Sequence, residues 1–399
     1  MDVDSFRADV HRFFGASQAA SDQLLAYGQN AFAQPPSPQN WDISPEPHIA
    51  AWQAYQAETL GQGVFPVLQQ KLVQLRFPIQ LGISEADSYR AATRRGISVE
   101  GMAEATGLHL EHPEGLQLQI HPSLAGPIPV LIPACREDFV TLVRALTMRN
   151  EPKPVPDSMG ACIVAGFNNW DRVGTYRQYW QAQHPELNPE RDWAAEFQRL
   201  IPRKELYQDR FILLSLGPYS NVSASQLDLG EKEWLDFSLT VRLEHESTHY
   251  LTRRLLGSMR NNVLDELIAD YRGIVSVLGH FRADWFLHFV GLENYPYYRE
   301  GGRLQNYRGQ PPLSDEAFQV LQAMVKAAAE HLEAFDRQQA ESLSSAAAQI
   351  RLILALTALS LEALACTEAR DHLQQAWDRT PEIPSPDSGP QLVGSFSSG

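Results

Sequence analysis

The chain has 399 residues, of which 44% are hydrophobic and 20% charged, and it carries a formal net charge of −15. This length is sufficient for a large core spread over two or three subdomains, and the composition is typical of a globular enzyme. The acidic balance argues against nucleic acid as a partner. Residues 1–7 lack the basic and apolar segments of a signal peptide, and the most apolar run, residues 352–365, is too short and too charged to span a membrane.

The cysteines are three in number, odd and widely spaced: Cys135, Cys162 and Cys366. This pattern favours reduced, buried thiols over a disulfide framework, because paired cysteines are typical of oxidising compartments. Together with the absence of a signal peptide, it predicts a cytoplasmic protein.

The N-terminal region, residues 1–150, is predicted to mix helices with a little sheet. Residues 116–120 alternate apolar and polar side chains, residues 127–132 are apolar, and the short segment between them favours a β-hairpin. Residues 137–148 are expected to form a helix. Three prolines between residues 150 and 160 give the best internal boundary.

A catalytic core is predicted over residues 151–300. Buried strands are expected at 161–167 and 211–216, and Asn168 and Asn169 are interpreted as turn formers. Residues 231–256 contain no Gly or Pro and end before Gly257, which predicts one long helix. A second helix is expected over 263–278, with an N-cap at Asn261 or Asn262.

The remainder is predicted to be a C-terminal helical region, residues 301–380, followed by a flexible tail, residues 381–399. Ser314 is the expected cap of the long helical stretch, with one break near residues 342–345. Beyond residue 380, Pro, Ser and Gly dominate, and apolar periodicity is lost. The predicted fold class is therefore α+β, mostly helical.

One stretch carries a recognisable chemistry, the His-Glu-x-x-His sequence from His245 to His249. Two histidines four residues apart on a helix lie on the same face and can bind one divalent cation. Glu246 follows the first histidine and can act as a general base on a bound water. This combination is the hydrolytic zinc motif.

A second pair of polar residues, Glu266 and Asp270, lies four residues apart on the second predicted helix. A catalytic zinc site takes three protein ligands, so a carboxylate from this helix could be the third. Glu266 is the preferred candidate, and Asp270 would then accept the free ring N–H of a ligand histidine. Asp270 as the third ligand and His280 as a further contender stay open.

The motif with its following Glu-x-x-x-Asp helix resembles the gluzincin metallopeptidases, the thermolysin-like and neprilysin-like enzymes. The resemblance covers residues 231–278 and implies a zincin-like domain with a small sheet beside the active-site helix. It also implies one Zn²⁺ held by His245, His249 and Glu266, Glu246 as general base, and Asp270 beyond the ligands. The chain differs in having Asp265 where thermolysin-like enzymes have Asn.

The same resemblance suggests what surrounds the site. By analogy, the strand at 211–216 would border the cleft as the edge strand that pairs with extended substrate. The loop after the second helix offers Tyr295, Tyr297 and Tyr298 as candidate donors to an oxyanion, and Tyr298 and Arg303 as candidate substrate contacts. Arg242 is interpreted as a structural ion-pair partner of a nearby acid.

Three functions are consistent with these features. The first is a zinc-dependent, narrow-specificity intracellular metallopeptidase that cleaves a peptide or small amide substrate. The second is a zinc hydrolase or lyase that acts on a small molecule in a biosynthetic pathway. The third is a non-catalytic binding protein on a zincin scaffold, although a structural zinc normally takes four protein ligands.

Overall fold

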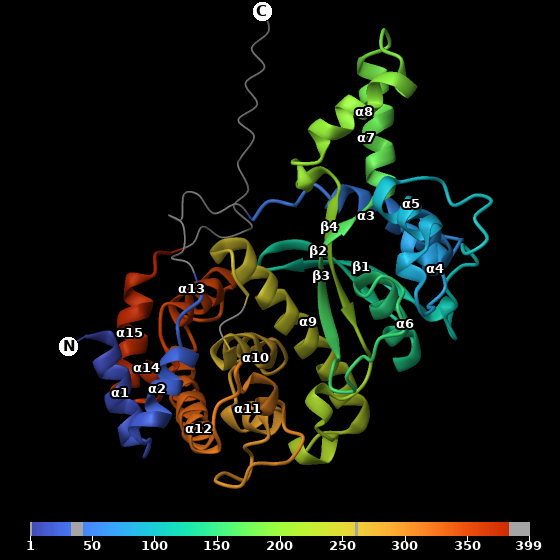
Figure 1. Ribbon diagram of the computed structural model, residues 1–399. Helices are drawn as coiled ribbons and strands as arrows, with labels where there is room; N and C mark the ends of the chain where they lie inside the picture. Colours follow the sequence, from blue (N-terminus) through green and yellow to red (C-terminus); the bar gives the residue numbers. More distant parts are fainter. Residues whose placement is uncertain (1, 33–42, 260–261, 383–399) are drawn as a thin grey trace, which may run out of the picture. The chain divides into compact units, whose positions relative to one another are not determined.

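The computed structural model describes residues 2–32, 43–259 and 262–382, and it is α+β and mostly helical, as predicted (Figure 1). The chain divides into two compact units. We call Ile43–Tyr219 with Lys232–Glu246 the sheet unit, and Met1–Asp42, Ser220–Glu231 and Ser247–Gly399 the helical unit. Both units are assembled from separate stretches, whereas the sequence analysis placed its boundaries at single points along the chain.

The sheet unit contains a four-stranded sheet formed by described residues, in the order β1-β2-β4-β3. Strands β1 and β2 form the predicted hairpin, which has a tight turn because Ser123 pairs with Gly126. Strand β2 runs parallel to β4, and β3 runs antiparallel to β4. The bounds are β1 Gln117–Ser123, β2 Gly126–Ile132, β3 Ala161–Asn168 and β4 Gln208–Leu214.

The expectation that the strand at 211–216 is an edge strand is wrong. Most of this segment belongs to β4, which lies between β2 and β3: it pairs with β3 along its length and with β2 at Ile212 and Leu213. A strand that lies between two neighbours does not offer the open edge that strand addition requires. Strand β3 is an edge strand instead, since β4 is its only partner among the described residues. Strand order depends on long-range pairing, which the local pattern does not specify.

Helices α3 and α6 pack on one face of this sheet, where Phe211 and Leu213 enter the main core cluster. Ile212 and Leu214 alternate to the opposite face and are also fully buried, so the sheet is covered on both sides. The helices of the unit are α3 Ile49–Glu58, α4 Val64–Lys71, α5 Asp87–Arg95, α6 Arg136–Thr147, α7 Trp170–Gln183 and α8 Pro189–Leu200.

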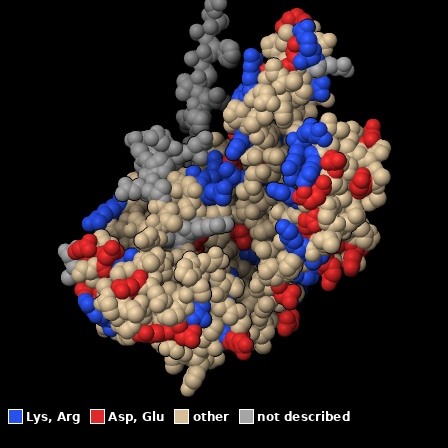
Figure 2. Space-filling view, viewed as in Figure 1, with Lys and Arg blue, Asp and Glu red and all other residues tan. Residues whose placement is uncertain are grey.

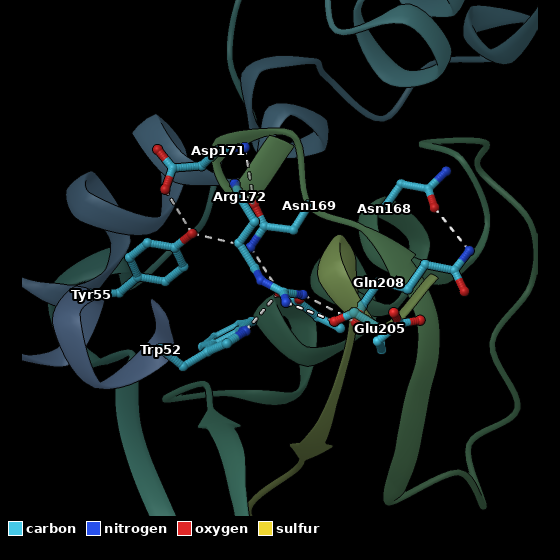
Figure 3. A network of polar contacts seen from close by, with 9 residues as sticks. Trp52, Tyr55, Asn168, Asn169, Asp171, Arg172, Glu205 and Gln208 are labelled. Carbon is cyan, nitrogen blue, oxygen red and sulfur yellow. Dashed lines mark hydrogen bonds and ion pairs between the residues drawn. The ribbon is translucent and has the colours of Figure 1, made fainter. Parts of the chain in front are cut away.

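A buried polar network anchors α7 to the sheet (Figure 3). The carboxylate of Asp209, at the start of β4, accepts hydrogen bonds from Trp52 and Asn169 and pairs with Arg172. Asn169 also caps α7, because its side-chain oxygen accepts from the backbone of Arg172. Asn169 was interpreted as a turn former, but a helix begins directly after it. The Asn169 side chain therefore has two roles: its oxygen caps the helix, and its amide nitrogen donates to the buried Asp209.

The helical unit surrounds α10, which is buried on almost all sides and contacts α11 and α13. Ser314 caps α12 as predicted, and the expected break before residue 346 is confirmed. A further break precedes α14, where Ser360 provides a cap. The helices are α1 Val3–Phe13, α2 Gln18–Tyr27, α10 Asn262–Leu278, α11 Ala283–Val290, α12 Asp315–Gln338, α13 Ala346–Thr357, α14 Leu361–Ala365 and α15 Ala369–Arg379.

A buried ion cluster joins α1 to α14. The Glu362 carboxylate lies 3.0 Å from Arg7 and 2.9 Å from His11. Burial raises the pKa of Glu362, but the hydrogen bond from His11 and the charge of Arg7 outweigh it and lower the pKa to about 2. The cluster therefore depends on an ionised Glu362.

The long helix α9, Glu231–Leu256, has the predicted bounds and ends at Gly257 with a left-handed φ of 69°. None of the described helices is both long and apolar enough to cross a membrane. On the face in Figure 2, acidic and basic side chains are interspersed. All three cysteines are free thiols. The predicted flexible tail lies, except for its first two residues, outside the described residues.

Candidate metal centre

Helix α9 presents His245 and His249 one turn apart, and each residue is only 6% exposed. Because a single continuous helix carries both, their spacing follows from helix geometry. An imidazole in such a position requires a polar partner, since an unpartnered buried polar group is costly.

Helix α10 provides the third group of the centre. The Glu266 Oε1 atom lies 3.7 Å from His249 Nε2. His245, His249 and Glu266 each offer one ligand atom, and these atoms lie within 4.8 Å of one another. Asp270, the alternative third ligand, is not in this group, and His280 is exposed and contacts the backbone of Leu278. The geometry thus favours Glu266 over both alternatives.

Asp265 takes a position at His249 that sequence reasoning did not assign to it. Its Oδ2 atom lies 3.2 Å from His249 Nδ1, and its side chain is 4% exposed. Asp265 and Glu266 therefore bracket the imidazole, one at each ring nitrogen. A carboxylate on Nδ1 favours the tautomer whose Nε2 lone pair is available to a metal. The only sequence signal was an acid immediately before the ligand candidate.

Asp270 is fully buried and forms an ion pair with Arg303. The Arg303 guanidinium also lies 4.0 Å from Glu266 and donates to the Ser220 hydroxyl at 3.2 Å. Ser220 adopts a left-handed φ of 51°, which is uncommon for a residue other than glycine. Asp270 thus positions a cation beside the candidate third ligand.

Tyr219 supports the other histidine. Its hydroxyl lies 2.9 Å from His245 Nδ1, and the side chain is buried. Arg242 holds the loop that precedes Tyr219 by donating to the carbonyls of Ser215 and Pro218. Its guanidinium also lies over the Tyr219 ring. Arg242 therefore holds the backbone carbonyls of this loop, and its predicted ion pair stays a prediction. Sequence reasoning gave the Tyr219 side chain no role, although its loop directly follows the strand that was expected to border the site.

Glu246, the predicted general base, is partly exposed, whereas its neighbours on α9 are buried. Burial, followed by the nearby Glu246 carboxylate, raises the pKa of Cys162 to about 12. The Cys162 thiol, on edge strand β3, is therefore protonated at neutral pH and not a nucleophile.

The most enclosed phenol of the tyrosine loop, that of Tyr298, is hydrogen-bonded within the loop itself. The Tyr298 hydroxyl donates to the Gly302 carbonyl and accepts from the Gln305 backbone N–H at 3.0 Å. Its proton is thus engaged within the loop, and the role of Tyr298 as a substrate contact stays a prediction. Tyr295 and Tyr297 are exposed, at 38% and 80%.

Tyr27, on α2, supports the start of α10. Its hydroxyl donates to the Tyr307 carbonyl at 2.8 Å and accepts from the Val263 backbone N–H at 3.4 Å. Burial and the Glu266 charge raise the pKa of Tyr27, and the Val263 contact lowers it. An N-terminal helix is thereby connected to the segment that carries Asp265 and Glu266.

Comparison with known proteins assigns most of the chain to a family. Residues 9–368 match a family described as a family of unknown function (DUF7005). The chain belongs to this family. No curated protein and no solved structure matched the chain. The candidate centre lies within the matched residues, so the DUF7005 match covers every residue proposed below to bind metal or transfer a proton.

Proposed function

We propose that this DUF7005 protein is a zinc-dependent hydrolase of the gluzincin type, with a peptide or small amide as substrate. The observation that carries the proposal is the convergence of His245, His249 and Glu266, whose ligand atoms lie within 4.8 Å of one another. Two imidazoles and a carboxylate form a three-ligand set that leaves a coordination position open, as catalytic zinc sites require.

The surroundings of these side chains fit a metal ion. Tyr219 lies at Nδ1 of His245, and Asp265 lies at Nδ1 of His249. Both Nε2 atoms therefore remain for coordination, and each Nδ1 atom has a side-chain oxygen close by. Metal-binding histidines characteristically show this arrangement. Without a metal ion, two buried histidines and three carboxylates would lie together in one small region with no cation at their centre.

Glu246 is proposed to transfer the proton. It is adjacent to a ligand in sequence but points about 100° further round the helix, given the 3.6-residue period. When bound, zinc would lower the pKa of a coordinated water and polarise the scissile carbonyl. Glu246 accepts a proton from the attacking water and returns it to the leaving amine, which changes the net proton count by zero.

An extended peptide is favoured as substrate by strand β3. This strand has β4 as its sole partner in the described part of the chain, and its Cys162 lies near Glu246. An unpaired strand edge can bind a peptide by strand addition, with main-chain hydrogen bonds that fix its register. Narrow specificity is expected, since an unrestricted peptidase would damage the cell that makes it.

Metal analysis tests the proposal directly. The double variant His245→Ala/His249→Ala should bind about one equivalent of zinc fewer than the unaltered protein, while circular dichroism shows the same helix content. Incubation with a peptide library, followed by mass spectrometry, should reveal cleavage only by the unaltered protein. Equal zinc content in both proteins would overturn the proposal. Zinc loss without any peptide cleavage would direct the search to small amides.

A further inference from the structure

A second group of metal-binding side chains lies in the sheet unit, with all of its members outside the centre described above. Glu111, His112 and Cys135 each offer one ligand atom, and these atoms lie within 4.8 Å of one another. Glu114 adds a carboxylate oxygen 3.7 Å from His112 Nδ1. A thiol, an imidazole and carboxylates form a donor set for zinc or a similar borderline divalent ion.

The backbone brings these side chains together through a buried acid. Asp138, in the first turn of α6, is 1% exposed. Its carboxylate accepts hydrogen bonds from the backbone N–H groups of Glu111, at 2.7 Å, and His112, at 3.0 Å. Cys135 is the residue immediately before α6. Asp138 thus holds the segment with two ligands against the helix end that carries the third.

The segment with Glu111 and His112 also lies close to the residue before Cys135. A Cβ atom on Gly115 would lie 2.6 Å from the Cβ of Ala134, so only glycine fits there. Leu110 and Leu116, which flank the segment, are buried in the main core cluster. The ligands therefore lie on backbone that is held at both ends, while the side chains of Glu111 and His112 remain exposed and can adjust to an ion.

We propose that Glu111, His112 and Cys135 form a second zinc site, with Glu114 in reach of the fourth position. The ion would join the loop before β1 to the start of α6. This inference does not depend on the proposed hydrolase activity, because its residues belong to other elements and include a sulfur ligand. The two centres should therefore be separable by variants and by spectroscopy.

Cobalt is the probe that distinguishes the sites. Co²⁺ bound to a thiolate gives a ligand-to-metal charge-transfer band in the near ultraviolet, and the centre on α9 and α10 has no sulfur donor. The full-length, chelator-treated His245→Ala/His249→Ala variant should show this band when Co²⁺ is added, with about one equivalent bound. Zinc should displace the cobalt and abolish the band.

Matched variants in the same background identify the ligands. Cys135→Ser should lose the band, and His112→Ala should weaken Co²⁺ binding at least as much as removal of an outer partner does, about tenfold or more. Cys162→Ser and His109→Ala are the controls, and both should keep the band. Zinc should also protect Cys135 from alkylation. No band in the parent variant, or a band that persists in Cys135→Ser, would overturn the inference.

Discussion

At the scale of single residues, Glu246 gives the sharpest test of the proposed chemistry. Glu246→Gln keeps the size and one acceptor of the side chain but cannot take up a proton. We expect this variant to retain zinc and fold and to lose peptide-cleaving activity by about 10²- to 10⁴-fold, the usual contribution of a general base. Steady-state kinetics with a parallel zinc determination provides the measurement.

Two results would contradict this role. Activity that survives the substitution would mean that another group takes the proton, and loss of zinc would make Glu246 a ligand. Cys162→Ser is a suitable control, because the Cys162 thiol lies beside the same carboxylate and is protonated at neutral pH. It should leave the rate within a few-fold of the unaltered protein.

The acids of α10 should differ in their effect on zinc affinity. Glu266→Ala removes a proposed ligand and should weaken binding most. Asp265→Asn and Asp270→Asn change groups that contact a ligand or Arg303, so each should weaken binding by about 10- to 100-fold. Competition with a chromogenic chelator gives the affinities, and the exposed Asp315→Asn serves as the control. If Asp270→Asn abolished zinc binding and Glu266→Ala did not, Asp270 would be the ligand and Glu266 the supporting residue.

The candidate ligands were accessible from the sequence because helix periodicity alone places His245 and His249 together. Their supporting residues were not. Tyr219 reaches His245 from a loop whose course depends on Arg242, and Asp265 reaches His249 only because α10 lies against α9. Such contacts arise from the packing of distant segments, which a local pattern does not encode.

At the scale of elements, two glycines should respond in opposite directions to the same change. Gly257 ends α9 with φ 69°, where an L side chain costs about 1–2 kcal/mol, so Gly257→Ala should lower the free energy of unfolding. Gly174 lies within α7 and has no atom within 4 Å of an added Cβ. Gly174→Ala should raise the stability by about 0.5–1 kcal/mol. Urea denaturation measures both, and equal signs would contradict the assignment.

The cluster that joins α1 to α14 should make the protein sensitive to acid. The pKa of Glu362 is about 2 in the folded protein, below its ordinary value of 4.5. The stabilisation is therefore fully present above pH 4.5 and is lost as the pH falls towards 2, with a total of roughly 3 kcal/mol. In Glu362→Gln, stability should depend less on pH over this range.

Denaturation midpoints at pH 5, 3 and 2 measure this effect. Glu330→Gln is the control, because its exposed ion pair with Lys326 should contribute little. An unchanged pH dependence in Glu362→Gln would show that other carboxylates cause the acid sensitivity.

Helices and strands with strong signals could be predicted from the sequence, and the others could not. The bounds of α9 follow from an uninterrupted stretch that ends at glycine. The β1–β2 hairpin follows from the alternation in residues 116–120, the short turn after it and the apolar residues 127–132. Helix α7 was missed because Asn168 and Asn169 looked like a turn, whereas Asn169 caps the helix and binds Asp209. The cap and the turn have the same local signature.

At the scale of the whole molecule, the division into units predicts which fragments fold. Residues 43–246 include every stretch of the sheet unit, so this fragment should show cooperative thermal unfolding by circular dichroism. Residues 1–150 contain β1 and β2 but lack β4, the strand that pairs with β2, and should not fold cooperatively. Cooperative unfolding of residues 1–150 would instead support the boundary expected near residue 150.

The Tyr27 contacts bear on how this family tolerates change at its N-terminus. Tyr27 bonds to the backbone of Val263 and Tyr307, between which the chain supplies Glu266 and Arg303. A deletion or fusion that displaces α2 would therefore loosen the backbone under a proposed zinc ligand. Substitutions in α2 and in the first turn of α10 should consequently be accepted in pairs, and relatives that lose the phenol should compensate near residue 263.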